Sequence, residues 1–234
     1  MECVSNETVL VFSNKNVSSN VFHILANAVV WNDFNRKNIL NYKNNEVVFK
    51  QGITADGLFL VLEGKLKISK FGHNNREQIV RLSNVGDITG HVAFFANELH
   101  SCTATSIGQS KILFLSKSSI LSVLEKNVDL LFAINEFLAK EIRRAEEKIV
   151  TIAQKQVKQR VIEAILMLQK KYGFESDGAT LSITLSRTEI AGIAGTVRET
   201  VSRMLADLSD AGLIEIDNKK IKFLNKEELV RQAQ

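Results

Sequence analysis

The 234-residue chain has no proline, only two cysteines and no apolar run long enough to span a membrane. Cys3 and Cys102 are too few and too far apart to hold a metal ion or an iron–sulfur cluster by themselves. We therefore expect two reduced thiols of minor structural importance. The lack of proline, beside frequent Asn and Lys, indicates genomic base composition rather than function.

The N-terminus shows no signal peptide, because it lacks a basic region followed by an apolar stretch. Since no run reaches membrane length either, the sequence predicts a soluble, cytoplasmic protein with no membrane partner. The net charge of +4 and the pI of about 9.0 suit a nucleic-acid partner but are weak evidence alone. The length allows two small domains, each with its own core.

Residues 185–214 have the pattern of two short helices joined by a tight turn. Ser186 followed by Glu189 forms a capping box, which predicts a helix that begins directly after Ser186. Gly195 lies where the chain must turn sharply, and we expect Thr196 to cap the second helix. This layout is typical of a helix-turn-helix, whose second helix enters the major groove of DNA.

Apolar residues of the second helix recur at helical spacing and leave polar residues on the opposite face. Arginine pairs bidentately with guanine and glutamate accepts from cytosine, each contact contributing roughly 1–3 kcal/mol of discrimination. A charge cluster alone is more often a solvated face, but the tight turn beside it favours base contacts. We therefore assign DNA contacts to Arg198, Glu199, Ser202, Arg203, Thr196, Arg187 and Lys219.

Two short alternating runs follow Gly212, separated by the polar residues 217–219. They predict a β-hairpin, which is the wing of a winged helix. Its charged tip is a candidate for phosphate contact, although tip charges are often only solvated. An apolar helix over 157–168 and a short strand over 181–185 complete this predicted domain.

Between Tyr42 and Lys117 the pattern changes to short alternating runs separated by glycines. Short strands with turn signals at this spacing predict a β-sandwich or barrel. The segment from Val21 to Val30, with Trp31, has a helical pattern and should pack on that barrel.

The stretch from about Val128 to Lys171 has an unbroken helical pattern. No glycine, proline or good N-cap marks a bend near Gln154–Gln156, so whether the helix bends there or continues stays open. Two series of residues recur every seven positions, offset by four, which is the pattern of a coiled-coil seam. The alternative is a single amphipathic helix lying on its own β domain. Because a helix-turn-helix that reads a palindrome needs two copies about 34–36 Å apart, we favour a homodimer. The predicted interface comprises Leu131, Asn135, Leu138, Ile142, Ala145, Ile149 and Ile152.

The run from Arg198 to Arg203, followed by Gly212-Leu-Ile, resembles the recognition helix of the Crp/Fnr family of bacterial transcription regulators. In that family the positions matching the two arginines and the glutamate read a half-site with a TGA core. The glycines around residues 58–64 and 85–90 are similar to those of the family's cyclic-nucleotide-binding β-roll. The resemblance extends from about residue 42 to 229 and implies RNA polymerase as a further partner.

The effector pocket departs from the cAMP-binding members of that family. There a glutamate follows the glycine that matches Gly90, and an Arg-Ser pair holds the cyclic phosphate; here His91 and the pair His100-Ser101 occupy those positions. A charged phosphate buried without its arginine is costly, so the resemblance implies an effector other than cAMP. In those members, hydroxyl side chains of the long helix contact the adenine; here Ala145 and Glu146 occupy these positions. The candidate pocket comprises Gly90, His91, Val92, His100, Ser101, Ala145 and Glu146.

His91 and His100 are candidates to bind haem, a metal or another anion, although two histidines lack the further ligands that a closed site needs. The simpler interpretation is ordinary polar residues in an altered pocket. Protonation near pH 6–7 would make such a pocket pH-sensitive. We predict no metal site and no definite cofactor, and an unidentified small-molecule effector stays open.

The sequence as a whole predicts an α+β protein: an N-terminal β-roll (a double-stranded β-helix) over residues 1–126, a dimerisation helix over 127–155 and a winged helix-turn-helix over 156–234. We expect a homodimeric, sequence-specific DNA-binding transcription regulator. A ligand-independent regulator and a cAMP-responsive one are the alternatives within this fold. No catalytic triad, P-loop, dinucleotide fingerprint or His-x-x-x-His helix is present, so we expect no enzyme.

Overall fold

The computed structural model describes residues 38–72 and 75–234. The chain forms two units, one with residues up to 71 and 80–142, the other with residues 72–79 and 143–234. Cys3 and the helix predicted over 21–31 lie outside the described residues. Within the described ranges, no helix is both long and apolar enough to cross a membrane.

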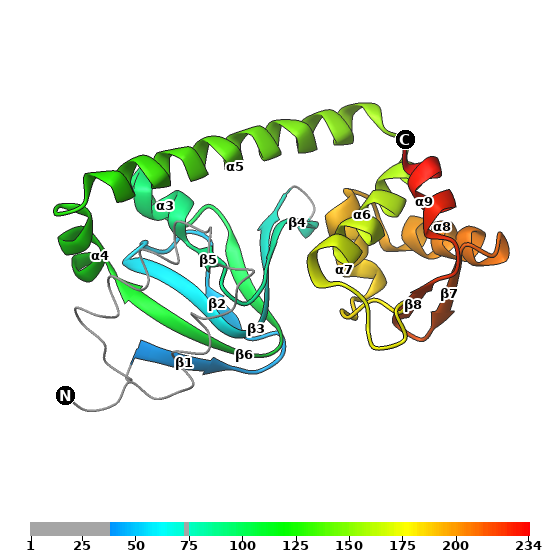
Figure 1. Ribbon diagram of the computed structural model, residues 1–234, viewed down its shortest axis with the longest axis horizontal. Helices are drawn as coiled ribbons and strands as arrows, with labels where there is room; N and C mark the ends of the chain where they lie inside the picture. Colours follow the sequence, from blue (N-terminus) through cyan, green and yellow to red (C-terminus); the bar gives the residue numbers. More distant parts are fainter. Residues whose placement is uncertain (1–37, 73–74) are drawn as a thin grey trace. The chain divides into compact units, whose positions relative to one another are not determined.

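An antiparallel sheet forms the first unit (Figure 1). Its two longest strands, β3 and β6, pair along most of their length. Strands β1 and β2 extend the sheet from β6, whereas β4 and β5 extend it from β3. The strands are β1 (Ile39–Tyr42), β2 (Val47–Phe49), β3 (Gly57–Phe71), β4 (Glu77–Ser83), β5 (Ile88–Thr89) and β6 (Thr103–Ser116). The first residues of β4, 77–79, are grouped with the second unit.

Three helices pack on this sheet: α3 (His91–Ala96), α4 (Lys117–Leu124) and the beginning of α5 (Val128–Gln154). Leu130 and Ile134 of α5 are buried in the same apolar cluster as the inward-facing residues of β3 and β6. The first turns of α5 are therefore held by the core of the first unit. The predicted N-terminal β-roll is confirmed.

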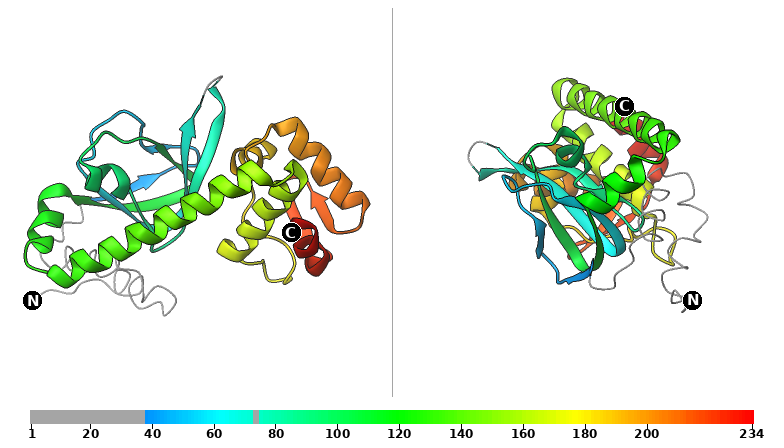
Figure 2. Two further views of the ribbon diagram at one scale, coloured as in Figure 1. Left: turned by 90° about the horizontal axis from the view of Figure 1, so that it is seen from above. Right: turned by 90° about the vertical axis from the view of Figure 1, so that its left-hand side faces the viewer.

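The second unit contains α6 (Val157–Tyr172), α7 (Arg187–Ala194), α8 (Arg198–Asp210), the hairpin strands β7 (Ile214–Asp217) and β8 (Lys220–Phe223), and α9 (Lys226–Ala233). Helix α6 packs against α7, α8 and α9, and α8 packs on β7 (Figures 1 and 2). The core comprises Val161, Ile162, Ile165, Ile190, Val201, Leu205, Leu208, Ile221 and Leu229. This confirms the predicted winged helix-turn-helix and, with the β-roll, the α+β class.

The short strand predicted over 181–185 is wrong, because this segment makes only isolated bridges. Thr180 pairs with Lys222 and Leu181 with Phe174, so two neighbouring residues bridge two different segments. The alternating burial of Leu181, Ile183 and Leu185 nevertheless imitates a strand.

The helical stretch over 128–171 is divided into two helices, which answers the question that the sequence left open, whether the chain bends near Gln154–Gln156. Helix α5 is continuous to Gln154 (Figure 2), but α6 begins at Val157 after an extended Gln156. Gln159 Oε1 accepts a hydrogen bond from the Gln156 backbone N–H across 2.9 Å and so satisfies one donor at the new N-terminus. Glutamine is not among the residues strongly preferred as N-caps, which is why the local sequence did not indicate this break.

Candidate nucleic-acid interface and effector pocket

Helix α8 separates its apolar and polar residues cleanly. Val201, Leu205 and Leu208 are buried in the second unit, whereas Arg198, Glu199, Ser202 and Arg203 are all exposed. Four of the predicted DNA-contacting residues therefore share one solvent-facing side of a rigid helix. Two guanidinium groups and a carboxylate on such a face suit the hydrogen-bonding edges of base pairs in the major groove.

The turn before α8 differs from the prediction at one residue. Gly195 has the expected left-handed conformation, with φ +66°. Thr196, however, does not cap α8; its backbone N–H donates to Ala191 O at 3.1 Å, and the half-exposed residue stays in the turn. Val197, which is extended, is the N-cap and offers no side-chain hydrogen bond. The prediction failed because Gly195 and Thr196 both belong to the turn, where their N–H groups donate to Ala191 O, and α8 begins only at Arg198.

The start of α7 confirms the predicted capping box. Ser186 Oγ accepts from the Glu189 N–H at 3.2 Å, and Glu189 Oε2 accepts from the Ser186 N–H at 2.8 Å. Arg187 follows as the first helical residue, half-buried, and its Nη2 donates to Asn218 O at the hairpin tip across 3.4 Å. Burial lowers the pKa of Arg187 below its usual value. This side chain therefore links the start of α7 to the wing.

Lys219 is exposed at the tip of the β7–β8 hairpin, as predicted for a phosphate contact. Its neighbour Lys220 pairs with Glu175 at 3.1 Å, and Lys222 pairs with Glu215 at 3.5 Å. These two lysines are therefore partly neutralised within the protein, while the tip lysine faces solvent.

In the first unit, Gly90 and His91 lie where β5 passes into α3. Gly90 is the left-handed N-cap of α3 (φ +89°), and His91 is almost fully buried. The His91 ring packs edge-on against Phe137 of α5, with ring centroids 5.3 Å apart. The predicted pocket residue is therefore enclosed between α3 and α5.

A charged group lies directly beside this histidine. Arg81 of β4 donates from Nη1 to Nε2 of His91 at 3.0 Å, and the same guanidinium forms an ion pair with Glu141 of α5. Burial, with the positive charge of Arg81 as the second cause, lowers the pKa of His91 to about 3. A histidine that accepts from arginine must be neutral at that nitrogen. His91 thus does not titrate near pH 6–7, which contradicts the predicted pH sensitivity at this residue.

His100 is also buried, and it stacks on Phe49 with ring centroids 4.0 Å apart. Burial lowers its pKa as well. A side-chain carbon built on Gly90 would lie 3.5 Å from His100 Cε1, so His100 and the Gly90 turn are neighbours. The structure brings these two predicted residues together through packing.

The remaining predicted pocket residues are less enclosed. Val92 and Ser101 are exposed, with Ser101 Oγ 3.8 Å from Cys102 Sγ. Ala145 and Glu146 are exposed on α5 and belong to the second unit, so their assignment to the pocket stays a prediction. Among the described residues, no group of three or more His, Cys, Asp or Glu is arranged to hold a metal ion.

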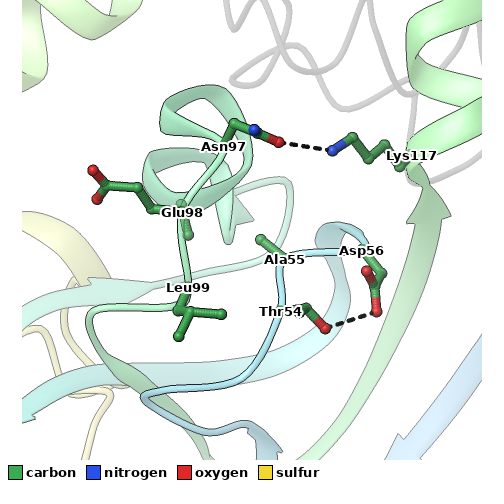
Figure 3. A pocket seen from close by; sticks show the side chains of 8 residues that line it. Thr54, Ala55, Asp56, Asn97, Glu98, Leu99 and Lys117 are labelled. Atoms are coloured by element: carbon green, nitrogen blue, oxygen red, sulfur yellow. Dashed lines mark hydrogen bonds between the residues drawn. The ribbon is translucent and has the colours of Figure 1, made fainter.

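A separate open groove of about 420 Å³ lies in the first unit beside the end of α3 (Figure 3). Lys117 Nζ donates to Asn97 Oδ1 at 3.0 Å on one side of it, and Thr54 Oγ1 donates to Asp56 Oδ2 at 3.2 Å on the other. The residues that line it include none of the predicted effector residues.

Sequence reasoning missed the two α5 residues and the β4 arginine that surround His91. Arg81 lies more than 50 residues before Phe137 and Glu141, and no short motif joins them. Only the pairing of the sheet and the packing of α5 on it bring them together.

Comparison with known proteins agrees with this architecture. The model of the cyclic nucleotide-binding domain matches residues 39–127, and that of the Crp-like helix-turn-helix domain matches residues 159–232. The chain is 26% identical over 196 residues to the CRP-like cAMP-activated global transcriptional regulator of Mycobacterium tuberculosis, covering 83% of this chain and 87% of the relative. The chain belongs to the Crp/Fnr family. It is thus a Crp-like transcription regulator with a helix-turn-helix DNA-binding domain, and not an enzyme.

A second relative is the anaerobic regulatory protein of Bacillus subtilis, which is 27% identical over 186 residues, covering 79% of this chain and 78% of the relative. Among solved structures, FixK2 from Bradyrhizobium japonicum has a TM-score of 0.74 at 21% identity, with 84% of this chain and 96% of that chain covered. This structural likeness shows that the folds of both units are similar to those of a solved structure.

Proposed function

We propose that this Crp/Fnr regulator binds palindromic DNA as a homodimer, with α8 of each copy reading a TGA-type half-site. The observation that carries this proposal is the exposed quartet on α8: Arg198, Glu199, Ser202 and Arg203. Arg187, Thr196 and Lys219 add contacts at the edge of the site. Base contacts on α8 supply specificity, and the basic tip residue adds sequence-independent affinity through phosphate.

Helix α5 supports a dimer because it exposes large apolar residues that a monomer leaves in water. Ile142 and Ile149, seven residues apart, are 62% and 66% exposed, and Leu131 and Ile152 are each 40% exposed. Leu138 is half-buried against the core of its own unit, whereas Asn135 and Ala145 are exposed. We assign all seven predicted seam residues to contact with a second copy of α5, because burying such a stripe is what a coiled coil does.

We further propose that the effector is not cAMP. The guanidinium of Arg81 is already paired with Glu141 and bonded to His91. A cyclic phosphate that used this arginine would have to displace a carboxylate, and the ribose would meet a neutral imidazole. This arrangement favours the ligand-independent alternative over the cAMP-responsive one, and it leaves open an unidentified effector that breaks the Arg81–Glu141 pair.

The same proposal assigns residues 1–126 to a sensor domain, 127–155 to dimerisation and 156–234 to DNA binding. RNA polymerase is the further partner that family membership suggests, and the cytoplasm is the place of action because bacterial DNA lies there.

Selection of bound duplexes from a random DNA library tests this function without assuming an operator. The proposal predicts enrichment of a palindrome whose two half-sites have their centres about one helical turn apart, 34–36 Å. Recovery of a single unrepeated site argues against the dimer, and recovery of random sequence argues against base reading by α8.

A further inference from the structure

The C-terminal end of α7 is held by side chains from three other segments of the second unit. The last carbonyl groups of a helix have no partner within the helix. Here Gly192 O accepts from Gln78 Nε2 at 2.5 Å, and Ile193 O accepts from Lys148 Nζ at 3.0 Å. The next two carbonyls, which lead directly into the turn before α8, both accept from one arginine.

That arginine is Arg160 of α6. Its Nε donates to Ala194 O at 3.0 Å and its Nη2 to Gly195 O at 3.3 Å. Its Nη1 donates to Ile152 O and to Lys155 O, each at 3.1 Å. One guanidinium therefore joins the C-terminal ends of α5 and α7, where a positive charge is favourable.

These hydrogen bonds determine how many N–H donors of Arg160 remain for other partners. A guanidinium has five N–H donors in a rigid plane, and four hydrogen bonds to backbone carbonyls use most of them. A basic residue on a helix of a DNA-binding unit is a common phosphate contact. The geometry instead gives Arg160 an internal role.

We propose that Arg160 is a positioning residue for DNA recognition, which sets the orientation of α8 by fixing the turn at 194–195 against the α5–α6 junction. The inference rests on the proposed function and adds a specificity determinant that does not touch DNA. Bidentate base contacts need accurate placement of α8, whereas phosphate contacts through flexible side chains tolerate small shifts. Loosening the turn should therefore impair specific binding and spare non-specific binding.

Lysine at position 160 keeps the charge but loses the planar fork that spans the two helix ends. We expect Arg160→Lys to weaken binding to the selected palindrome by about tenfold or more, the scale of one bidentate base contact. Affinity for a random duplex and its dependence on salt should stay unchanged. The matched control is Lys158→Ala, because Lys158 is exposed on the same helix. An equal loss of affinity on both duplexes for Arg160→Lys overturns the proposal, because it would mean that Arg160 does not act on sequence reading in particular.

Amide hydrogen exchange of the DNA-free protein provides a readout that does not depend on the proposed function. The N–H groups of Gly195 and Thr196 both donate to Ala191 O within this turn. We expect Arg160→Lys to speed their exchange by about tenfold while Lys158→Ala leaves it unchanged; unchanged exchange in both variants overturns the positioning role. If the wild-type protein shows no DNA sequence preference but amide exchange responds to Arg160→Lys as expected, the proposed function fails. The role of Arg160 in fixing the turn at 194–195 is then still supported. Arg160→Gln replaces Arg160→Lys in both experiments if the latter does not fold.

Discussion

Arg81 donates from Nη1 to Nε2 of His91 across 3.0 Å. This bond joins β4 to the start of α3, and the ion pair of the same guanidinium with Glu141 extends the connection to α5. The long helix is therefore tied to the β-roll by an arginine that also bonds to His91 of the predicted effector pocket. A ligand influences α5 from this pocket only if it prefers one arrangement of that connection.

The buried histidine predicts a specific dependence of stability on pH. His91 has a pKa of about 3 in the folded protein, below its unfolded value of about 6.5. The unfolded state therefore binds more protons below pH 6.5, so stability falls as the pH drops from 6.5 toward 3 and is unaffected by this residue between pH 7 and 8. Loss of about 2 kcal/mol between pH 7 and 4.5 is expected from urea unfolding.

His91→Gln is the matched variant for that measurement, because glutamine also accepts from Arg81 but does not titrate. Its stability should decline less over the same pH range, since only the carboxylates and His100, whose pKa is also lowered by burial, then contribute to the decline. Parallel pH profiles for the two proteins would show that His91 is not held neutral by the fold.

Arg203→Ala should weaken specific binding by roughly 1–3 kcal/mol and relax the preference at one base pair. Arg203 is exposed on the α8 face and α8 is otherwise anchored by buried Val201 and Leu205, so its removal should leave the fold intact. Competition between duplexes with single base changes measures both effects. A loss of equal size on random DNA would count against base reading.

Lys219→Ala should weaken binding to all duplexes alike. Lys219 lies at the exposed hairpin tip, and we expect this lysine to contact phosphate rather than a base edge. Affinities measured at several salt concentrations should show the salt slope reduced by about 0.9. A change confined to one base pair would mean that the wing reads sequence.

Replacing Ile142 and Ile149 together by glutamine should shift the protein from dimer to monomer. These are the two most exposed aliphatic residues of the proposed seam, and each loses most of its apolar side chain. Glu147→Gln, an exposed residue of the same helix outside the seam, serves as the control. Sedimentation equilibrium at micromolar protein concentration distinguishes dimer from monomer. An unchanged association constant in the double variant would exclude α5 as the dimer interface.

Most of the helices and turns of the DNA-binding half could be predicted from short sequence signals. The Ser186–Glu189 box predicted the start of α7 and Gly195 predicted the turn after it, because each acts through contacts within a few residues. The same local reasoning placed the N-cap of α8 at Thr196, which is wrong; the N–H of Thr196 donates to Ala191 O in the turn, and Val197 is the N-cap.

Contacts between distant segments had no such signal. The role of Arg160 depends on carbonyls of Ile152 and Ala194, which lie on two other helices. The partners of His91 likewise come from β4 and α5. A basic residue on a helix and a lone histidine each fit many environments, so only the folded chain shows which groups they contact.

Fluorescence anisotropy of a labelled palindromic duplex with two TGTGA-type half-sites, titrated with protein at fixed salt with and without cAMP, tests the central claim most directly. The account predicts tight binding that cAMP leaves unchanged, and much weaker binding when both half-sites are scrambled. Equal affinity for the palindrome and the scrambled duplex would contradict sequence reading by α8, and binding that appears only with cAMP would contradict the effector assignment.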